Sequence, residues 1–229
     1  METLANGFTL DIPQGAFPLS TDSILLADFV RLPKNARVLD LGAGCGTLGI
    51  LLCAKDDNCC VTGIELSETA HTASLSNIAA NSLQPRMKSI CADIRNTHED
   101  FSAGSFDVCV SNPPYYSGGP TSTHHSTARR QDFCTTEQLC QAAAHALRYG
   151  GDFFLVHKPE NLAHICVCAS KSGMEVKELC LVRHKKDAQP NMILIKCRKG
   201  GKPGMNLTEL YLFHSDSSPT DYYKKLYRL

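Results

Sequence analysis

The sequence lacks any apolar run long enough to cross a membrane, and it lacks an export signal. Its longest apolar stretch, Leu48 to Ala54, has seven residues, whereas a membrane-spanning helix needs about 20. The first residues, Met1-Glu2-Thr3, are not the basic stretch and apolar core of a signal peptide. These absences predict a soluble, cytoplasmic protein with no membrane partner.

Cysteine pairs at metal-binding spacing are also absent. The 229 residues include 12 cysteines, but no two of them have the C-x2-C spacing of zinc sites and thioredoxin-like motifs. Cys59 and Cys60 are adjacent, and Cys166 and Cys168 lie one residue apart. We therefore predict free, buried thiols and no metal site.

Net charge is the third absence, because 23 basic residues balance 23 acidic ones. The distribution is uneven: residues 180–229 hold ten Lys or Arg against four Asp or Glu, a balance of +6, and residues 1–179 carry −6. The asymmetry favours a C-terminal quarter that faces an anion such as nucleic acid, with a solvated surface as the alternative. The content of 43% hydrophobic and 20% charged residues excludes a disordered or fibrous chain.

Short apolar runs alternate with helix-length segments, which is typical of an α/β protein with a mainly parallel sheet. The expected strands are 37–41, 61–65, 87–91, 107–111, 152–157, 175–182 and 191–197. The expected helices are 23–30, 47–55, one that Ser67 can cap and that runs to about Asn81, 136–147 and one from Pro159 to about Gly173. We predict a single domain, residues 1–229, with an N-terminal cap segment (1–33), a core (34–198) and a basic C-terminal tail (199–229).

A glycine turn follows the first strand of this core. The segment Val38-Leu-Asp-Leu-Gly-Ala-Gly-Cys-Gly46 leads from a strand into backbone that must pass close to a ligand, where a side chain would collide with it. Its candidate cofactor-binding residues are Asp40, Gly42, Gly44 and Gly46. The turn predicts a nucleotide-like cofactor.

Carboxylates at the ends of the next two strands extend this cofactor site. Glu65 is placed to accept hydrogen bonds from a ribose diol, and Asp93 to accept from an adenine amino group. The glycines also fit the dinucleotide fingerprint, so NAD stays an alternative. Asp40 favours S-adenosylmethionine, because a pyrophosphate beside the turn would be repelled by a carboxylate.

A sharper motif, Ser111-Asn-Pro-Pro-Tyr-Tyr116, follows the fourth strand. Two prolines fix the backbone and remove N–H donors, so carbonyl oxygens remain as acceptors. The side-chain oxygen of Asn112 and the carbonyl of Pro113, ahead of Pro114, can together accept both hydrogens of a planar amino group, and the ring of Tyr115 offers a stacking face. We predict that these residues hold an amino nitrogen whose lone pair is conjugated.

These motifs, in this order, resemble class I S-adenosylmethionine-dependent amino-methyltransferases. The doubled Tyr115-Tyr116 and three further stretches narrow the resemblance to the bacterial tRNA(Val) adenine-N6-methyltransferase group: Phe17 to Ala27, Leu155-Val-His-Lys-Pro-Glu160 and Arg198 to Gly204. The likeness runs from about residue 7 to residue 227. One departure is Gln131 in Ala128-Arg-Arg-Gln131, where relatives often carry an acidic residue.

The resemblance implies a Rossmann-like α/β fold with a seven-stranded, mainly parallel sheet, an antiparallel last strand and helices on both faces. It implies N6-methylation of an adenine in the tRNA anticodon loop, beside the anticodon, with Glu65 on the cofactor ribose, Asp93 near its adenine, and Asn112 to Tyr115 around the target base. Ribosomal RNA and a protein glutamine are alternative substrates, and an NAD-dependent oxidoreductase is the alternative class.

Basic residues supply the expected RNA-binding surface. We predict that they form one continuous face around the mouth of the active site and hold phosphates on either side of a flipped base. Its main members are Arg129, Arg130, Lys185, Lys186, Lys199 and Lys202.

Overall fold

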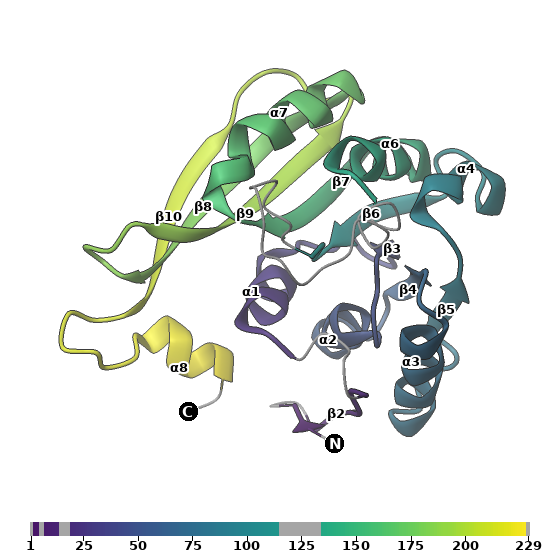
Figure 1. Cartoon of the computed structure of the whole chain (residues 1–229), viewed down its shortest axis with the longest axis horizontal. Helices are drawn as coiled ribbons and strands as arrows, with labels where there is room; N and C mark the ends of the chain where they lie inside the picture. Colours follow the sequence, from purple (N-terminus) through teal and green to yellow (C-terminus); the bar gives the residue numbers. More distant parts are fainter. Residues whose placement is uncertain (1, 5–6, 14–18, 115–133, 228–229) are drawn as a thin grey trace, which may run out of the picture.

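The computed structural model describes residues 2–4, 7–13, 19–114 and 134–227. Its eight-stranded sheet has the strand order β10-β8-β9-β7-β6-β3-β4-β5 (Figure 1). The strands are β3 (Arg37–Leu41), β4 (Cys60–Glu65), β5 (Met87–Cys91), β6 (Phe106–Ser111), β7 (Leu147–His157), β8 (Met174–Lys185), β9 (Pro190–Lys199) and β10 (Asn206–Phe213). β9 runs antiparallel to both of its neighbours, and all other pairs are parallel.

Helices cover both faces of this sheet (Figure 1). One face carries α1 (Thr21–Phe29), α2 (Thr47–Lys55) and α3 (Glu68–Ala80), and the other carries α4 (Thr97–Asp100), α6 (Thr136–Ala146) and α7 (Leu162–Lys171). A separate hydrophobic cluster fills the space between the sheet and each helical layer. Two 3-10 turns, η1 (Ile94–Asn96) and η2 (Pro159–Asn161), precede α4 and α7. The arrangement confirms the predicted α/β fold.

The sheet has one strand more than the seven expected. β10 lies in the segment predicted to be a basic tail and pairs in parallel with β8. Leu212 is buried, and Leu210 and Phe213 pack against the same core cluster as α1. Because these apolar residues extend the core, the segment adds an edge strand, and α8 (Asp221–Tyr227) follows it.

A short N-terminal hairpin is tied to α3 by asparagine side chains. Its strands, β1 (Glu2–Thr3) and β2 (Thr9–Leu10), pair antiparallel. Asn81 Oδ1 accepts from the Thr9 N–H and Asn81 Nδ2 donates to the Thr9 carbonyl. Asn77, one turn earlier, makes the same two contacts with Asp11 and also donates to the carbonyl of Cys45. These amides therefore connect the hairpin, α3 and the glycine turn.

The twelve cysteines all lie in described parts of the chain and are free thiols, eight of them buried. Within those parts, no three His, Cys, Asp or Glu side chains are grouped as metal ligands. None of the described helices has both the length and the apolar character that spanning a bilayer requires.

Candidate active site

The candidate site lies at the topological switch point of the sheet, where the chain connections on the two sides of β3 run in opposite directions. β3 pairs with β4 on one side and with β6 on the other, so the carboxyl ends of the three strands leave a crevice between diverging connections. Ligands of open α/β sheets bind at such points. The Ser111 hydroxyl, at the end of β6, donates to the Leu41 carbonyl at 2.7 Å and joins the strand ends on the two sides of the crevice.

A cavity of about 680 Å³ opens at this crevice. Its volume is within the roughly 300–1,000 Å³ typical of small-molecule sites. Sequence-predicted residues that line it are Asp40, Gly42, Gly44, Glu65, Asp93, Asn112, Pro113 and Pro114. Ser20 and Ser23 of the N-terminal segment line it as well and are not among the predicted site residues.

Three glycines of the turn have positive φ angles, which is the conformation that favours glycine. The values are 79° at Gly42, 54° at Gly44 and 83° at Gly46. A Cβ added at Gly44 would meet no described protein atom within 4 Å, so glycine there leaves space to the cavity. A Cβ at Gly46 would lie 2.7 Å from the Ser74 hydroxyl of α3. Gly46 is therefore required by helix packing and does not line the cavity.

Asp40 is a buried carboxyl with an incomplete set of partners. It is 1% exposed, and its Oδ2 has no hydrogen-bond partner among the described residues. Burial, and then the nearby charge of Glu65, raises the pKa of Asp40 to about 7. An orphaned, buried carboxylate oxygen beside a second carboxylate favours a cationic ligand group in the cavity.

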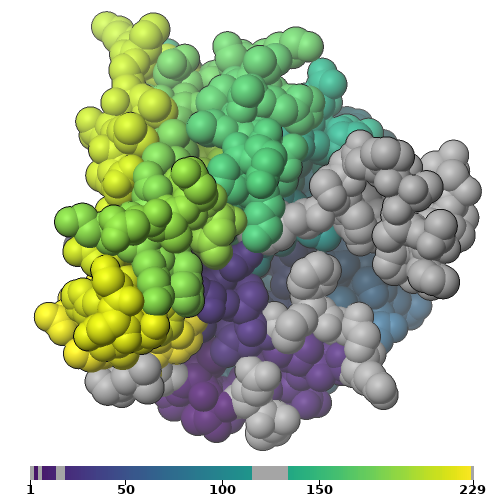
Figure 2. All heavy atoms as spheres, turned by 60° about the vertical axis from the view of Figure 1, so that its left-hand side comes forward, coloured from purple at the N-terminus to yellow at the C-terminus, as the bar shows by residue number. Residues whose placement is uncertain are grey.

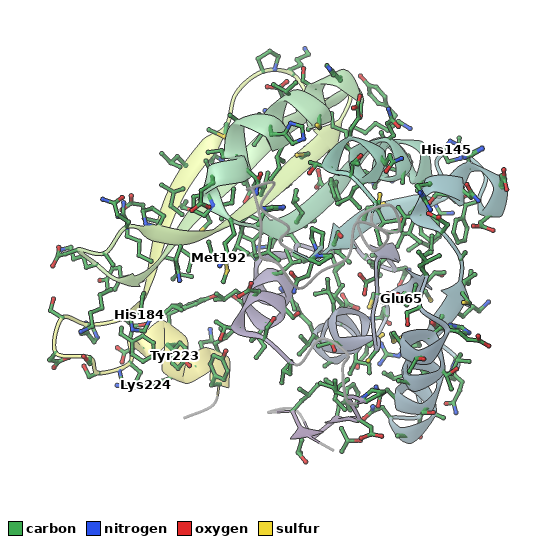
Figure 3. All side chains as sticks on the ribbon, viewed as in Figure 1. Glu65, His145, His184, Met192, Tyr223 and Lys224 are labelled. Carbon is green, nitrogen blue, oxygen red and sulfur yellow. The ribbon has the colours of Figure 1, made fainter. Side chains whose placement is uncertain are left out.

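Glu65, labelled in Figure 3, ends β4. Its carboxylate bonds the glycine turn and the segment that leads into α3. Its Oε2 accepts from the Gly44 N–H and its Oε1 from the Ser67 N–H, both at 2.8 Å. Because a carboxylate offers about four acceptor positions, each oxygen keeps capacity for a ligand hydroxyl. Glu65 thus both shapes the glycine turn and presents acceptors to the cavity.

Asp93 lines the cavity but is already engaged by Arg95. Its side chain caps η1 by accepting from the Arg95 N–H at 2.9 Å. The Arg95 guanidinium also donates from Nε to both oxygens of Asp93, at 3.0 and 2.8 Å. The side-chain hydrogen bonds from Arg95 are the largest cause of the lowered pKa of Asp93. An adenine amino group would therefore share this carboxylate with a guanidinium.

Asn112 is held by a residue from the other end of the domain. Its Nδ2 donates to the Ser23 hydroxyl of α1 at 2.9 Å. Ser20 caps the same helix by accepting from the Ser23 N–H, and its hydroxyl lies 3.5 Å from the Ser23 hydroxyl. The predicted stacking residue Tyr115 lies outside the described residues, as do Arg129, Arg130 and Gln131.

The remaining basic residues are divided between the two ends of the strands. Lys185 ends β8 on the side of the sheet where the parallel strands end and where the cavity lies, and Lys186 follows it in the β8–β9 hairpin. Lys199 instead pairs with the first residue of β8 and donates to the carbonyl of Leu147, the first residue of β7. Lys202 follows Lys199 in the chain, and its carbonyl accepts from Lys177 near the start of β8. The prediction of one continuous face is therefore wrong for Lys199 and Lys202.

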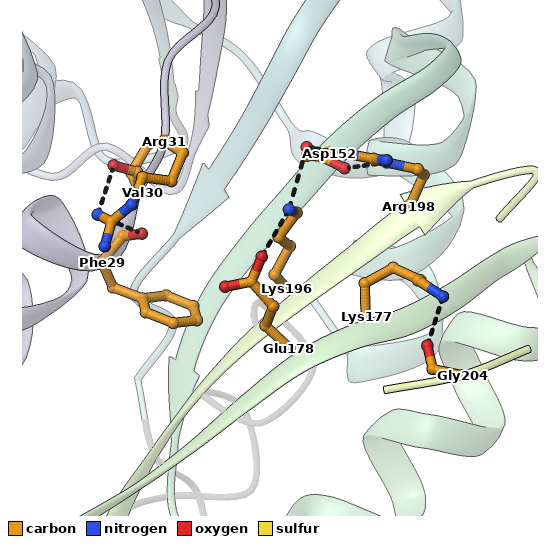
Figure 4. Close-up of polar contacts among 9 residues, drawn as sticks. All are labelled: Phe29, Val30, Arg31, Asp152, Lys177, Glu178, Lys196, Arg198 and Gly204. Atoms are coloured by element: carbon orange, nitrogen blue, oxygen red, sulfur yellow. Dashed lines mark hydrogen bonds and ion pairs between the residues drawn. The ribbon is translucent and has the colours of Figure 1, made fainter. Parts of the chain in front are cut away.

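Carboxylates neutralise part of the C-terminal charge. Arg198 donates to Asp152 at 2.7 Å, and Lys196 lies between Asp152 and Glu178 (Figure 4). Lys177 donates to the Gly204 carbonyl in the same region (Figure 4). Part of the +6 charge is thus compensated by ion pairs within the sheet, so the net charge of residues 180–229 does not measure the charge available to a partner.

The sheet order, the glycine turn and the cavity at the switch point define a class I, Rossmann-like methyltransferase domain. A comparison with family models matches residues 19–167 to the methyltransferase small domain. A predicted O-methyltransferase from Agrobacterium tumefaciens, known from a crystal structure, has the same fold, with a TM-score of 0.75 at 20% identity over 91% of this chain and 96% of the other.

Curated relatives are similar over most of their length. The tRNA1(Val) (adenine(37)-N6)-methyltransferase of Shewanella halifaxensis is 30% identical over 80% of this chain and 75% of its own. The protein of the same name from Bacteroides fragilis is 29% identical over 82% of this chain and 80% of its own. The chain belongs to the methyltransferase small domain family.

Proposed function

We propose that the protein transfers a methyl group from S-adenosylmethionine to the N6 amino group of an adenine in tRNA. The observation that carries the proposal is the turn Asn112 to Pro114, which lines the same cavity as the glycine turn. The names of the curated relatives support adenine and tRNA as the substrate.

The residues of the cavity fit S-adenosylmethionine. The orphaned oxygen of Asp40 suits a cationic amino group, the free acceptor positions of Glu65 suit ribose hydroxyls, and the open side of Gly44 leaves room for the ligand. Bound there, S-adenosylmethionine supplies an electrophilic methyl group on a sulfonium.

The chain's own residues orient the acceptor nitrogen. Nδ2 of Asn112 donates to Ser23, and its Oδ1 is the carboxamide atom that can accept an amino hydrogen. The carbonyl of Pro113 can accept the second hydrogen, and neither proline offers a competing N–H. These acceptors pull the nitrogen toward a tetrahedral geometry, which reduces the conjugation of its lone pair with the ring and directs the pair toward the methyl group. The nitrogen releases one proton once the methyl group has bonded. Alignment of this kind is worth roughly 7–11 kcal/mol of the barrier.

The anticodon loop is the proposed location of the adenine. Its bases are single-stranded, so flipping one into the cavity costs less than in a duplex. Lys185 and Lys186 are at the edge of the sheet that carries the cavity and are proposed to contact phosphates of the loop. Tyr115, Arg129 and Arg130 stay predictions for stacking and phosphate contact.

The test is methyl transfer from labelled S-adenosylmethionine to tRNA, followed by mass spectrometry of the nucleosides. We expect N6-methyladenosine with the unaltered protein and none above background with Asn112→Ala, which should still bind the cofactor. Label in ribosomal RNA or in protein glutamine, with none in tRNA, would replace the proposed substrate. Binding of NAD without binding of S-adenosylmethionine would overturn the proposed class.

A further inference from the structure

The N-terminal helix α1 contacts the catalytic turn, although about 90 residues separate Ser23 from Asn112. Ser23 is buried, with 7% exposure, and lines the cavity together with Ser20. The Ser23 hydroxyl accepts from the amide of Asn112, and its oxygen lies 3.5 Å from the hydroxyl oxygen of Ser20. These contacts link the helix cap to the carboxamide.

The contact with Ser23 holds one end of the carboxamide in place. Because Nδ2 is the end bound to α1, Oδ1 is the end that can serve as an acceptor, which an amino group requires. A hydroxyl can accept from Nδ2 or donate to Oδ1, so Ser23 anchors the position of the carboxamide and does not select between its two orientations. Removing the hydroxyl therefore removes a contact that holds the carboxamide where it meets the amino group.

The C-terminal helix α8 in turn holds α1 (Figure 2). Tyr222 donates its hydroxyl to Asp28 Oδ2 at 2.8 Å, near the end of α1. The Tyr227 hydroxyl lies 3.0 Å from the Thr21 hydroxyl at the start of α1. Rings continue from Tyr227 to Tyr223 and on to Phe213 of β10, with centroids 4.5 and 4.8 Å apart. Both ends of α1 are thus tied to α8, which in turn packs against β10.

We propose that Ser23 is a positioning residue that anchors the carboxamide of Asn112, and that Tyr222 and Tyr227 of α8 hold the helix on which Ser23 stands. The inference deepens the proposed function and rests on it, because it assigns Asn112 the role of accepting the target amino group.

Ser23→Ala tests the first step, since alanine keeps the helix and removes only the hydroxyl. We expect kcat to fall by about 10-fold with the Kd for S-adenosylmethionine unchanged, as loss of one anchoring hydrogen bond implies. Ser23→Thr, which restores a hydroxyl, should recover most of the rate. Ser76→Ala in α3, whose hydroxyl donates to the Thr72 carbonyl of the same helix, is the control and should match the unaltered protein.

Tyr222→Phe and Tyr227→Phe test the second step, with Tyr149→Phe as the matched control. Tyr149 is 77% exposed and its hydroxyl donates to Gly200 beside Lys199, at the edge away from the cavity. Each α8 variant should lower kcat by about three-fold without weakening cofactor binding, and the control should not. Unaltered kcat in both would remove α8 from the proposal.

The side-chain amide resonances of Asn112, assigned by comparison with Asn112→Ala, give a readout that needs no turnover. We expect slow hydrogen exchange of this NH2 in the unaltered protein and fast exchange in Ser23→Ala. An active protein whose Ser23→Ala variant keeps kcat and slow exchange overturns the inference and leaves the function standing. Equal losses in kcat and cofactor affinity would make Ser23 a cofactor ligand and also overturn it. A protein with no methyl transfer to tRNA overturns the function, and the exchange measurement then still decides whether Ser23 holds the amide.

Discussion

Replacing Asp40 by asparagine is expected to remove a pH-dependent cost of folding. The carboxyl is buried, and its pKa rises from 3.8 in the unfolded chain to about 7 in the folded protein. Between these values the folded state binds a proton that the unfolded state has released. The unfolding free energy contributed by this group therefore falls as pH rises through that window and stays low above it.

The size of this effect follows from the shift in pKa. A rise of about 3 units corresponds to about 4 kcal/mol above the folded-state pKa, at about 1.4 kcal/mol per unit. Between about pH 5 and about pH 8, the unfolding free energy of the unaltered protein should fall by about 2.5 kcal/mol more than that of Asp40→Asn. The asparagine has hydrogen-bonding needs of its own, but they are the same at both pH values and cancel in the comparison.

The assay is urea unfolding of the cofactor-free protein at the two pH values, with linear extrapolation to water. Asp57→Asn is the control, because it makes the same change of residue at a side chain that is 96% exposed. Equal losses of stability in Asp40→Asn and the unaltered protein would refute the reasoning, since Asp40 would then titrate as it does in water.

Three further predictions test the site and its supports. Glu65→Gln should weaken S-adenosylmethionine binding by roughly 1–3 kcal/mol in calorimetry, because it replaces a charged acceptor that also holds the Gly44 N–H; unchanged affinity would contradict the ribose assignment. Asn77→Ala should lower the unfolding free energy by roughly 1–3 kcal/mol in urea, since it removes the amide that bonds the backbone of Asp11 and the buried carbonyl of Cys45, whereas the exposed Asn58→Ala should change little. The double substitution Lys185→Ala/Lys186→Ala should weaken tRNA binding and flatten its dependence on salt without affecting cofactor affinity; tRNA affinity equal to that of the unaltered protein at two salt concentrations would exclude these lysines from the interface.

Much of the fold could be predicted because local patterns determine it. The apolar strands 37–41, 87–91 and 107–111 match the structure or differ from it by one residue, and Ser67 caps α3 as its position before the helix indicates. The edge strand β10 could not be predicted, because apolar and more polar residues alternate in its sequence only over Leu210 to Leu212. Its first four residues are exposed and carry no such pattern. Its pairing with β8 is a long-range contact that no local pattern encodes.

The site residues likewise include some that local patterns predict and some that only long-range packing brings to the site. Residues that end parallel strands, such as Glu65 and Asn112, are brought together by the topology alone. The role of Ser23 could not be predicted, because its contact with Asn112 depends on how α1 packs across the end of the sheet. The prediction that Lys199 lies near the mouth of the active site was wrong for a related reason. Because β9 is antiparallel, its last residue lies beside the first residue of β8, and a count of charges along the sequence does not show this.

The contacts between α1 and α8 have a consequence for the order in which the molecule is built. They join segments about 200 residues apart, from Asp28 to Tyr222 and from Thr21 to Tyr227. Since synthesis runs from the N-terminus, α1, the glycine turn and Asn112 all leave the ribosome well before residues 221–227 exist. A nascent chain can form the central strands and the cofactor turn, but its N-terminal helix has only part of its final support until the segment 221–227 has emerged.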